Sequence, residues 1–246
     1  GLCAYFLMPD EPVVANWLVG LPLAALALAL FHAIQGWITL LPLRSSVEQH
    51  SWLITTMAVS VMIGASILVW QGPFALNVRS PFPSLPLIGT RTPASYLLAI
   101  GLAIFWCVAL AWFHRRTRVG LAMSALAQDF DAARAAGLRV RQLQVLSFGI
   151  SGLIIGSAGF VAAPVIKVSA DSGIAYVLSG FIAAVVGGLG SNVGALIGGP
   201  LVGVAAMFAA FRFGGQFQNL VSLGLLIVVL MLRPQGLFGR LAARRV

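Results

Sequence analysis

The chain has very few charged side chains. Only 9% of its 246 residues are charged, while 60% are hydrophobic, and it contains a single lysine, Lys167. A soluble domain needs more polar surface than this. Several apolar runs reach the roughly 20 residues that cross about 30 Å of hydrocarbon. The composition therefore excludes an ordinary soluble domain and indicates an integral membrane protein.

Acidic residues are scarce and lie outside the apolar runs. The chain has six, which are Asp10, Glu11, Glu48, Asp129, Asp131 and Asp171. A proton-coupled transporter usually needs an intramembrane carboxylate or an equivalent group as a relay. A proton-driven carrier is therefore disfavoured, while sodium coupling through backbone carbonyls stays open.

Catalytic and metal-binding motifs are missing as well. The three histidines, His32, His50 and His114, are far apart, without an HExxH motif or a nucleophile elbow. Cys3 and Cys107 lack metal-ligand spacing. We therefore expect no enzyme activity, no metal and no cofactor. His32, the one histidine inside an apolar run, is interpreted as a hydrogen-bonded packing residue.

A nucleotide-binding loop is also absent. No G-x-x-x-x-G-K-[ST] motif occurs, so this polypeptide cannot itself hold ATP in a P-loop. If ATP hydrolysis drives transport, another subunit must bind and hydrolyse the ATP.

The apolar runs predict an all-α polytopic membrane fold with about seven membrane segments. Five spans are expected at 13–34, 52–70, 94–113, 143–163 and 217–232. The region 174–211 is too long for one helix, and GGLGSNVG at 187–194 interrupts it. Dense glycines break helices because each loses more backbone entropy than alanine. We therefore predict two shorter segments around a tight turn.

Basic residues predict the sidedness. The stretches 114–118 (HRRTR) and 240–246 (RLAARRV) are both expected in the cytoplasm. Placing 35–51 and 114–142 inside puts 71–93 and 164–173 outside, and only two crossings within 174–211 return the tail to the cytoplasm. Only Arg79, Arg91, Lys167 and Arg212 then lie outside. A single span with a re-entrant loop is the alternative, and it would break this parity.

Glycines and a few polar residues are the candidates for packing and for a pathway. Three G-x-x-x-G pairs allow close helix packing: Gly152 with Gly156, Gly194 with Gly198, and Gly199 with Gly203. Broken helices at membrane depth are either buried in protein or line a cavity. The expected pathway-lining residues are Thr55, Thr56, Ser60, Gly188, Gly190, Ser191 and Asn192. The alternative for the hydroxyls is bonding to their own helix backbone.

One alanine-rich stretch differs from its apolar neighbours. Residues 120–136 (GLAMSALAQDFDAARAA) predict one cytoplasmic helix, with Gly137 as its C-cap and Leu138 as the apolar partner. Small side chains allow close approach of another protein. The charges of Asp129, Asp131 and Arg134 can fix how the two surfaces align. A solvated connecting helix is the alternative.

Three stretches in order carry a family resemblance. They are GLAMSALAQDFDAARAAGLRVRQLQVLSFGISGLIIGSAGFVAAP, GFIAAVVGGLGSNVGALIGGPLVG and LRPQGLFG. They resemble the permease subunits of bacterial ABC importers of the branched-chain amino-acid (Liv) type, over about residues 36–239. GWITLLPLRSS and LITTMAVSVMI favour the LivH-like half of that family.

The resemblance implies an architecture and partners. The chain would be one transmembrane permease domain, 1–246, with a cytoplasmic coupling loop at 114–142. Residues 1–8 resemble only the end of the family's second span, and earlier spans, with their Asn-Ala-His-Gly-like turn, have no counterpart. Implied partners are a second permease, two cytoplasmic ATPase subunits, a periplasmic binding protein and membrane lipid, without nucleic acid. Implied coupling-helix residues are Asp129, Ala132, Ala133, Arg134 and Gly137.

The expected function is import of a branched-chain or other amino acid by alternating access, in the bacterial inner membrane, with the C-terminus cytoplasmic. Urea, short amides or aromatic acids are alternative substrates. An ATP-independent carrier or channel, or a structural scaffold without a pathway, are rival functions.

Overall fold

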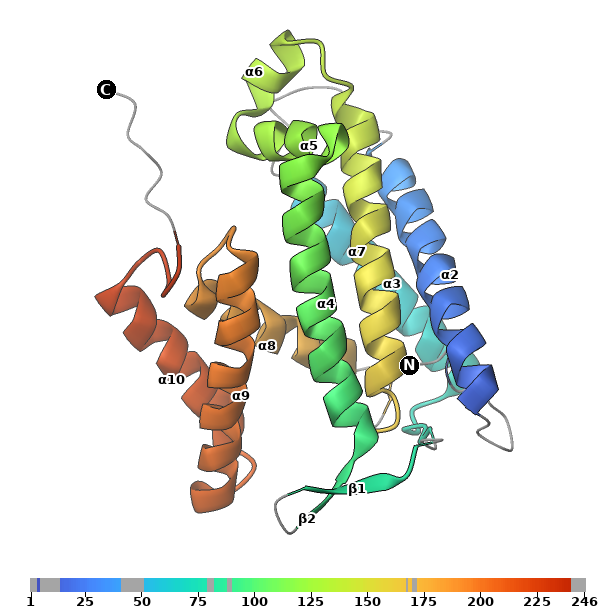
Figure 1. Ribbon diagram of the computed structural model, residues 1–246, viewed down its shortest axis with the longest axis vertical. Coiled ribbons are helices and arrows are strands. Elements are labelled where there is room, and N and C mark those ends of the chain that lie inside the picture. The colour runs from blue at the N-terminus through green and yellow to red at the C-terminus, as the bar shows by residue number, and fades with distance from the viewer. Residues whose placement is uncertain are drawn as a thin grey trace. The chain divides into compact units, whose positions relative to one another are not determined.

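The computed structural model describes residues 4, 14–40, 51–78, 82–87, 90–166, 168–169 and 172–239. The chain forms two compact units, Gly1–Ala170 and Asp171–Val246, which we describe separately (Figure 1).

Unit 1 contains long helices and a small hairpin. The helices are α2 (Val14–Leu40), α3 (Ser51–Gln71), α4 (Ala94–Arg116), α5 (Arg118–Gln128), α6 (Phe130–Ala135) and α7 (Val140–Ala162). Strands β1 (Ser84–Leu87) and β2 (Thr90–Pro93) pair antiparallel. The hairpin leads into one end of α4, and α5 lies across the other end (Figure 1).

The described residues of unit 2 form three helices, α8 (Ser172–Gly187), α9 (Asn192–Phe213) and α10 (Phe217–Leu232). The predicted break within 174–211 is confirmed, because a turn at residues 188–191 separates α8 from α9. Gly188 and Gly190 have φ angles of 109° and 84° in this turn. Such angles are strained for other residues, so glycine chemistry explains where the helix stops.

The helices match the predicted membrane class. By length and composition, four helices among the described residues are sufficient to cross a membrane, namely α2, α4, α7 and α9, and α3, α8 and α10 contain shorter apolar stretches. The all-α polytopic fold is thus supported, with the β1–β2 hairpin as a small addition that the sequence did not predict. Seven crossings stay a prediction.

Two contacts support the predicted alternation of the unit 1 helices. The Arg141 guanidinium lies 5.9 Å from the centroid of the Trp37 ring, which brings the end of α2 to the start of α7. At the opposite helix ends, Leu76 and Val168 exchange backbone hydrogen bonds of 2.8 and 3.1 Å. Helix ends predicted to share a side of the membrane therefore share an end of unit 1. The cytoplasmic identity of that end stays a prediction.

Several residues considered in the sequence analysis lie outside the described residues. These are Asp10, Glu11, Arg44, Glu48, His50, Arg79, Lys167, Asp171, Arg240, Arg244 and Arg245, and Cys3 is among them as well.

Glycines set the packing of α7 on α2. A Cβ atom on Gly152 would lie 2.5 Å from the Leu28 carbonyl oxygen, and one on Gly156 would lie 2.9 Å from the Ala25 Cα atom. The same pattern recurs in unit 2, where Gly198 leaves no room for a Cβ atom against α8. Two of the predicted pairs are therefore packing motifs within the chain.

The third pair differs. A Cβ atom on Gly199 or Gly203 would meet no described atom within 4 Å. Identical spacing in the sequence thus corresponds to two packing environments.

This contrast predicts different responses to a single methyl group. Gly152→Ala is expected to destabilise the purified protein by about 1–3 kcal/mol, because the backbones of α2 and α7 must separate. Gly203→Ala is expected to be neutral or stabilising, since alanine has a helix propensity about 1 kcal/mol better than glycine. Thermal unfolding in detergent measures both, and equal midpoints would contradict the packing assignment.

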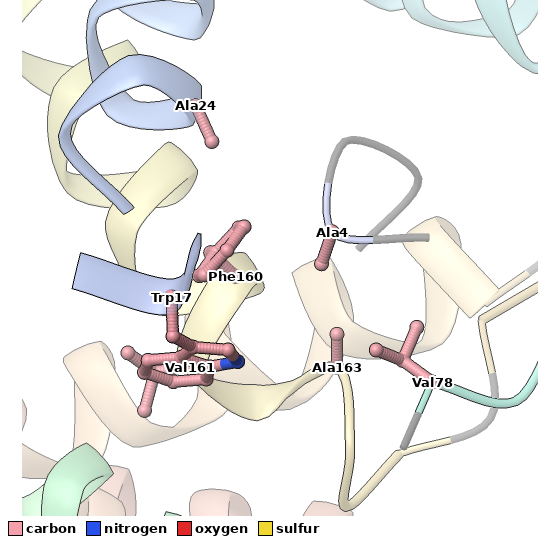
Figure 2. Close-up of a cluster of buried hydrophobic side chains, with 7 residues drawn as sticks. All are labelled: Ala4, Trp17, Ala24, Val78, Phe160, Val161 and Ala163. Carbon is pink, nitrogen blue, oxygen red and sulfur yellow. The ribbon is translucent and has the colours of Figure 1, made fainter. Parts of the chain in front are cut away.

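Aromatic packing closes the other end of the α2–α7 pair. The Trp17 ring lies 5.0 Å from the Phe160 ring and 5.2 Å, edge-on, from the Phe82 ring, measured between centroids. The surrounding cluster contains Ala4, Ala24, Val78, Val161 and Ala163 (Figure 2). The Trp17 indole N–H is buried and has no hydrogen-bond partner among the described residues. Contact with the Phe82 and Phe160 rings packs Trp17 into this cluster.

Candidate coupling and pathway sites

The alanine-rich stretch forms two helices. The prediction of one helix over 120–136 is wrong, because the chain leaves helical geometry at Asp129, with φ −152° and ψ 105°. The Asp129 carboxylate accepts a 2.9 Å hydrogen bond from the Ala132 N–H and caps α6. Aspartate side chains compete for backbone donors in this way, which favours caps over helix interiors.

The end of α6 follows the prediction. Gly137 has a φ of 79°, and its N–H donates to the Arg134 carbonyl at 3.0 Å. The Leu138 N–H donates to the Ala133 carbonyl at 3.2 Å. These two bonds define a Schellman motif, so Gly137 as the helix cap is confirmed.

The turn between α4 and α5 involves residues that sequence reasoning missed. The Thr117 hydroxyl donates to the Phe113 carbonyl at 2.7 Å and accepts from the Gly120 N–H at 3.0 Å. A Cβ atom on Gly120 would lie 2.8 Å from the His114 Cα atom. The T-x-x-G spacing was the available signal, since threonine is a favoured N-cap. Close packing at Gly120 fixes how α5 leaves α4.

The predicted coupling residues divide by exposure. Ala133 is only 5% exposed, so its side chain faces the interior of unit 1. Asp129, Ala132, Arg134 and Gly137 are exposed. These four residues, without Ala133, define the α6 surface.

The polar side chains predicted to line a pathway from α3 include one that bonds to its own helix backbone. The Ser60 hydroxyl is exposed and donates to the Met57 carbonyl at 2.8 Å. Thr55 and Thr56 are half-buried. His32 behaves similarly, because its Nδ1 lies 2.9 Å from the Leu28 carbonyl oxygen of its own helix. These contacts agree with backbone bonding, and pathway lining by α3 stays a prediction.

The turn of unit 2 has a capped and a packed side. The Ser191 hydroxyl accepts from the Gly194 N–H at 3.0 Å and caps α9. Gly188 is buried, and a Cβ atom there would clash with the backbone of Gly239. Gly190 and Asn192 are exposed. Exposure in this turn thus begins directly after Gly188, at Leu189, and lining of a pathway stays a prediction.

The chain after α10 folds back onto that turn. The Leu237 N–H donates to the Val186 carbonyl and the Phe238 N–H to the Gly187 carbonyl, both at 2.9 Å. The last carbonyls of a helix have no intrahelical partner, so these bonds cap α8. Leu237 also packs against the buried cluster of Ile182, Val186 and Val202. We call Arg233–Gly239 the tail clasp.

Family comparison gives these elements a context. The family model described as "Branched-chain amino acid transport system / permease component" matches residues 1–230. The chain belongs to this permease family. The match confirms the resemblance seen in the sequence and extends it to residue 1.

Several permeases are similar to the chain. It is 30% identical to the high-affinity branched-chain amino acid transport system permease protein BraD of Pseudomonas aeruginosa, over 79% of the chain and 66% of BraD. Identity to LivH of Salmonella typhimurium is 28%, over 83% of the chain and 68% of LivH. The alignments thus span about two thirds of these relatives. No solved structure matches the chain.

The chain also resembles, at lower identity, a permease named for a different solute. The chain is 27% identical to the autoinducer 2 import system permease protein LsrC of Photorhabdus laumondii, over 72% of the chain and 50% of LsrC. The relatives are transport permeases and not enzymes.

Proposed function

We propose that this chain is the permease subunit of an ATP-binding-cassette importer for branched-chain or related amino acids. It forms the translocation pathway by alternating access, and separate subunits hydrolyse ATP. The observation that carries the proposal is the family match over residues 1–230, together with relatives whose names specify branched-chain amino acid transport.

The proposed assembly contains a second permease, two cytoplasmic ATPase subunits and a periplasmic binding protein. It lies in the bacterial inner membrane, with residues 114–142 and the C-terminus in the cytoplasm. The basic character of 114–118 and 240–246 supports this orientation, because basic loops stay in the cytoplasm.

The α6 surface is the proposed docking site for the ATPase. It is exposed, its helix is capped at both ends, and it lies beyond α5, in the stretch of chain that connects the long helices α4 and α7 (Figure 1). Thr117 and Gly120 tie α5 closely to the end of α4. Only residues 136–139 separate α6 from the start of α7. Movement of a bound ATPase would therefore displace both long helices.

The pathway proposal keeps the exposed Gly190 and Asn192 and the half-buried Ser191 of the unit 2 turn, with the α3 hydroxyls of Thr55, Thr56 and Ser60. Similarity to permeases for autoinducer 2 is a reason to test solutes other than amino acids.

Uptake with defined partners tests the function. Cells lacking their own leucine import would express the complete gene product with its ATPases and binding protein, or without the ATPases. We expect radiolabelled leucine uptake only with the ATPases present. Competition by isoleucine, phenylalanine, urea and acetamide then ranks the substrates. Equal uptake without ATPases would replace the importer with an ATP-independent carrier.

A further inference from the structure

Five arginines gather where α4 and α7 meet the cytoplasmic loop predicted at 114–142. They are exposed, and within the described part of the chain none forms an ion pair: Arg115, Arg116, Arg118, Arg139 and Arg141. We call them the arginine belt. An unpaired arginine keeps a full positive charge and five N–H donors available to a partner.

Tryptophans locate the belt at the membrane boundary. Trp37 is 52% exposed and Trp112 is 62% exposed. Exposed tryptophans of membrane helices favour the headgroup level. The Arg141 guanidinium stacks 5.9 Å from the Trp37 ring centroid. Arg115 follows Trp112 by one helical turn, about 5 Å along the axis. The belt therefore lies at the depth of lipid phosphates.

The acidic residues of the same loop form no ion pair with the belt within the described part of the chain. Asp129 and Asp131 lie at the start of α6, beyond α5, and are exposed. Since α5 lies across the end of α4, α6 is reached only after the chain has left the α4 axis (Figure 1). Charge is thus arranged with the belt at the ends of α4 and α7 and the mixed charges on α6.

We propose that the arginine belt binds the headgroups of anionic phospholipids. Arginine forms bidentate hydrogen bonds with phosphate oxygens, and basic clusters next to membrane helices attract anionic lipid surfaces. A protein partner fits less well, because the belt begins in the last turn of α4 and the first turn of α7, where these helices leave the lipid. The proposal requires the membrane assignment but no particular transport substrate.

Lipid retention tests the belt. The purified permease would be exchanged into equal mixtures of phosphatidylglycerol and phosphatidylcholine, and retained lipids would be quantified by native mass spectrometry. We expect preferential retention of phosphatidylglycerol, falling about fivefold for each belt arginine removed. The variants are Arg139→Gln with Arg141→Gln, and separately Arg115→Gln with Arg116→Gln. The matched control, Arg212→Gln with Arg233→Gln, removes two exposed charges outside both the belt and the α6 surface and should keep the preference.

The outcomes separate the alternatives. Unchanged retention in both belt variants, with monodisperse protein, would overturn the proposal. Displacement of phosphatidylglycerol by millimolar inorganic phosphate would identify a phosphate site and not a lipid site. Loss of ATPase co-purification without any change in lipid retention would assign the belt to the protein partner. Because lipid retention requires no uptake, its failure is distinguishable from failure of the proposed importer function.

Discussion

Replacing Ala132 with arginine is expected to abolish solute uptake and co-purification of the ATPase, while the amount of permease in the membrane stays unchanged. Ala132 is exposed on the α6 surface. Its backbone N–H receives the Asp129 cap, and a change of side chain leaves that donor in place. A long charged side chain would prevent close approach of a partner, so we expect at least about a tenfold loss of uptake, or roughly 1.4 kcal/mol of coupling.

The neighbouring residue provides the structural comparison. Ala133 is 5% exposed, so Ala133→Arg would bury an unpaired charge. This variant should reduce the amount of folded permease, and its loss of uptake would say nothing about docking. Ala132→Ser should keep both uptake and co-purification, because serine stays small. Normal uptake and ATPase binding in Ala132→Arg would remove the α6 surface from the coupling mechanism.

Gly236→Ala is expected to open the tail clasp and to destabilise unit 2. Gly236 has a φ of 78°, and a Cβ atom there would lie 2.5 Å from the Gly188 Cα atom. The backbone must shift, which weakens the bonds from Leu237 and Phe238 to α8. Two backbone hydrogen bonds contribute about 1 kcal/mol each, and loss of the contacts of the partly buried Leu237 adds up to about 1.5 kcal/mol.

Gly190→Ala is the matched control for the clasp. Gly190 has a similar φ of 84°, but a Cβ atom there would meet no described atom within 4 Å. Both variants suffer backbone strain of about 1–2 kcal/mol, and only Gly236→Ala adds the clash. Hydrogen exchange at Leu237 and Phe238, with the thermal midpoint, measures the difference. Similar exchange rates in the two variants would show that the clasp contributes little.

Local chemistry was enough to predict several features. The helix break came from the density of glycines at 187–194, and the cap at Gly137 from its place after an alanine-rich run. In both cases neighbouring residues decide the geometry, since positive φ angles favour glycine wherever the segment lies. The error at Asp129 was also local, because an aspartate before an alanine run is as suited to an N-cap as to a helix interior.

Other features depend on segments distant in the chain. Nothing in G-x-x-x-G spacing distinguishes Gly152, which touches α2, from Gly203, which touches no described neighbour. Ala132 and Ala133 are adjacent alanines that the sequence does not distinguish. Only the packing of α6 within unit 1 leaves Ala132 exposed and buries Ala133. The contacts of the tail clasp were likewise invisible, although its LRPQGLFG motif contributed to the family resemblance.

Apolar length, glycine breaks and motif order are properties of the chain alone, so they are sufficient to predict a helical membrane protein of the branched-chain amino-acid permease family. Which small residues pack, which face of α6 is free, and how the tail caps α8 follow only from the folded structure. These depend on approach distances between backbones far apart in sequence, where a single Cβ atom determines whether two helices can touch.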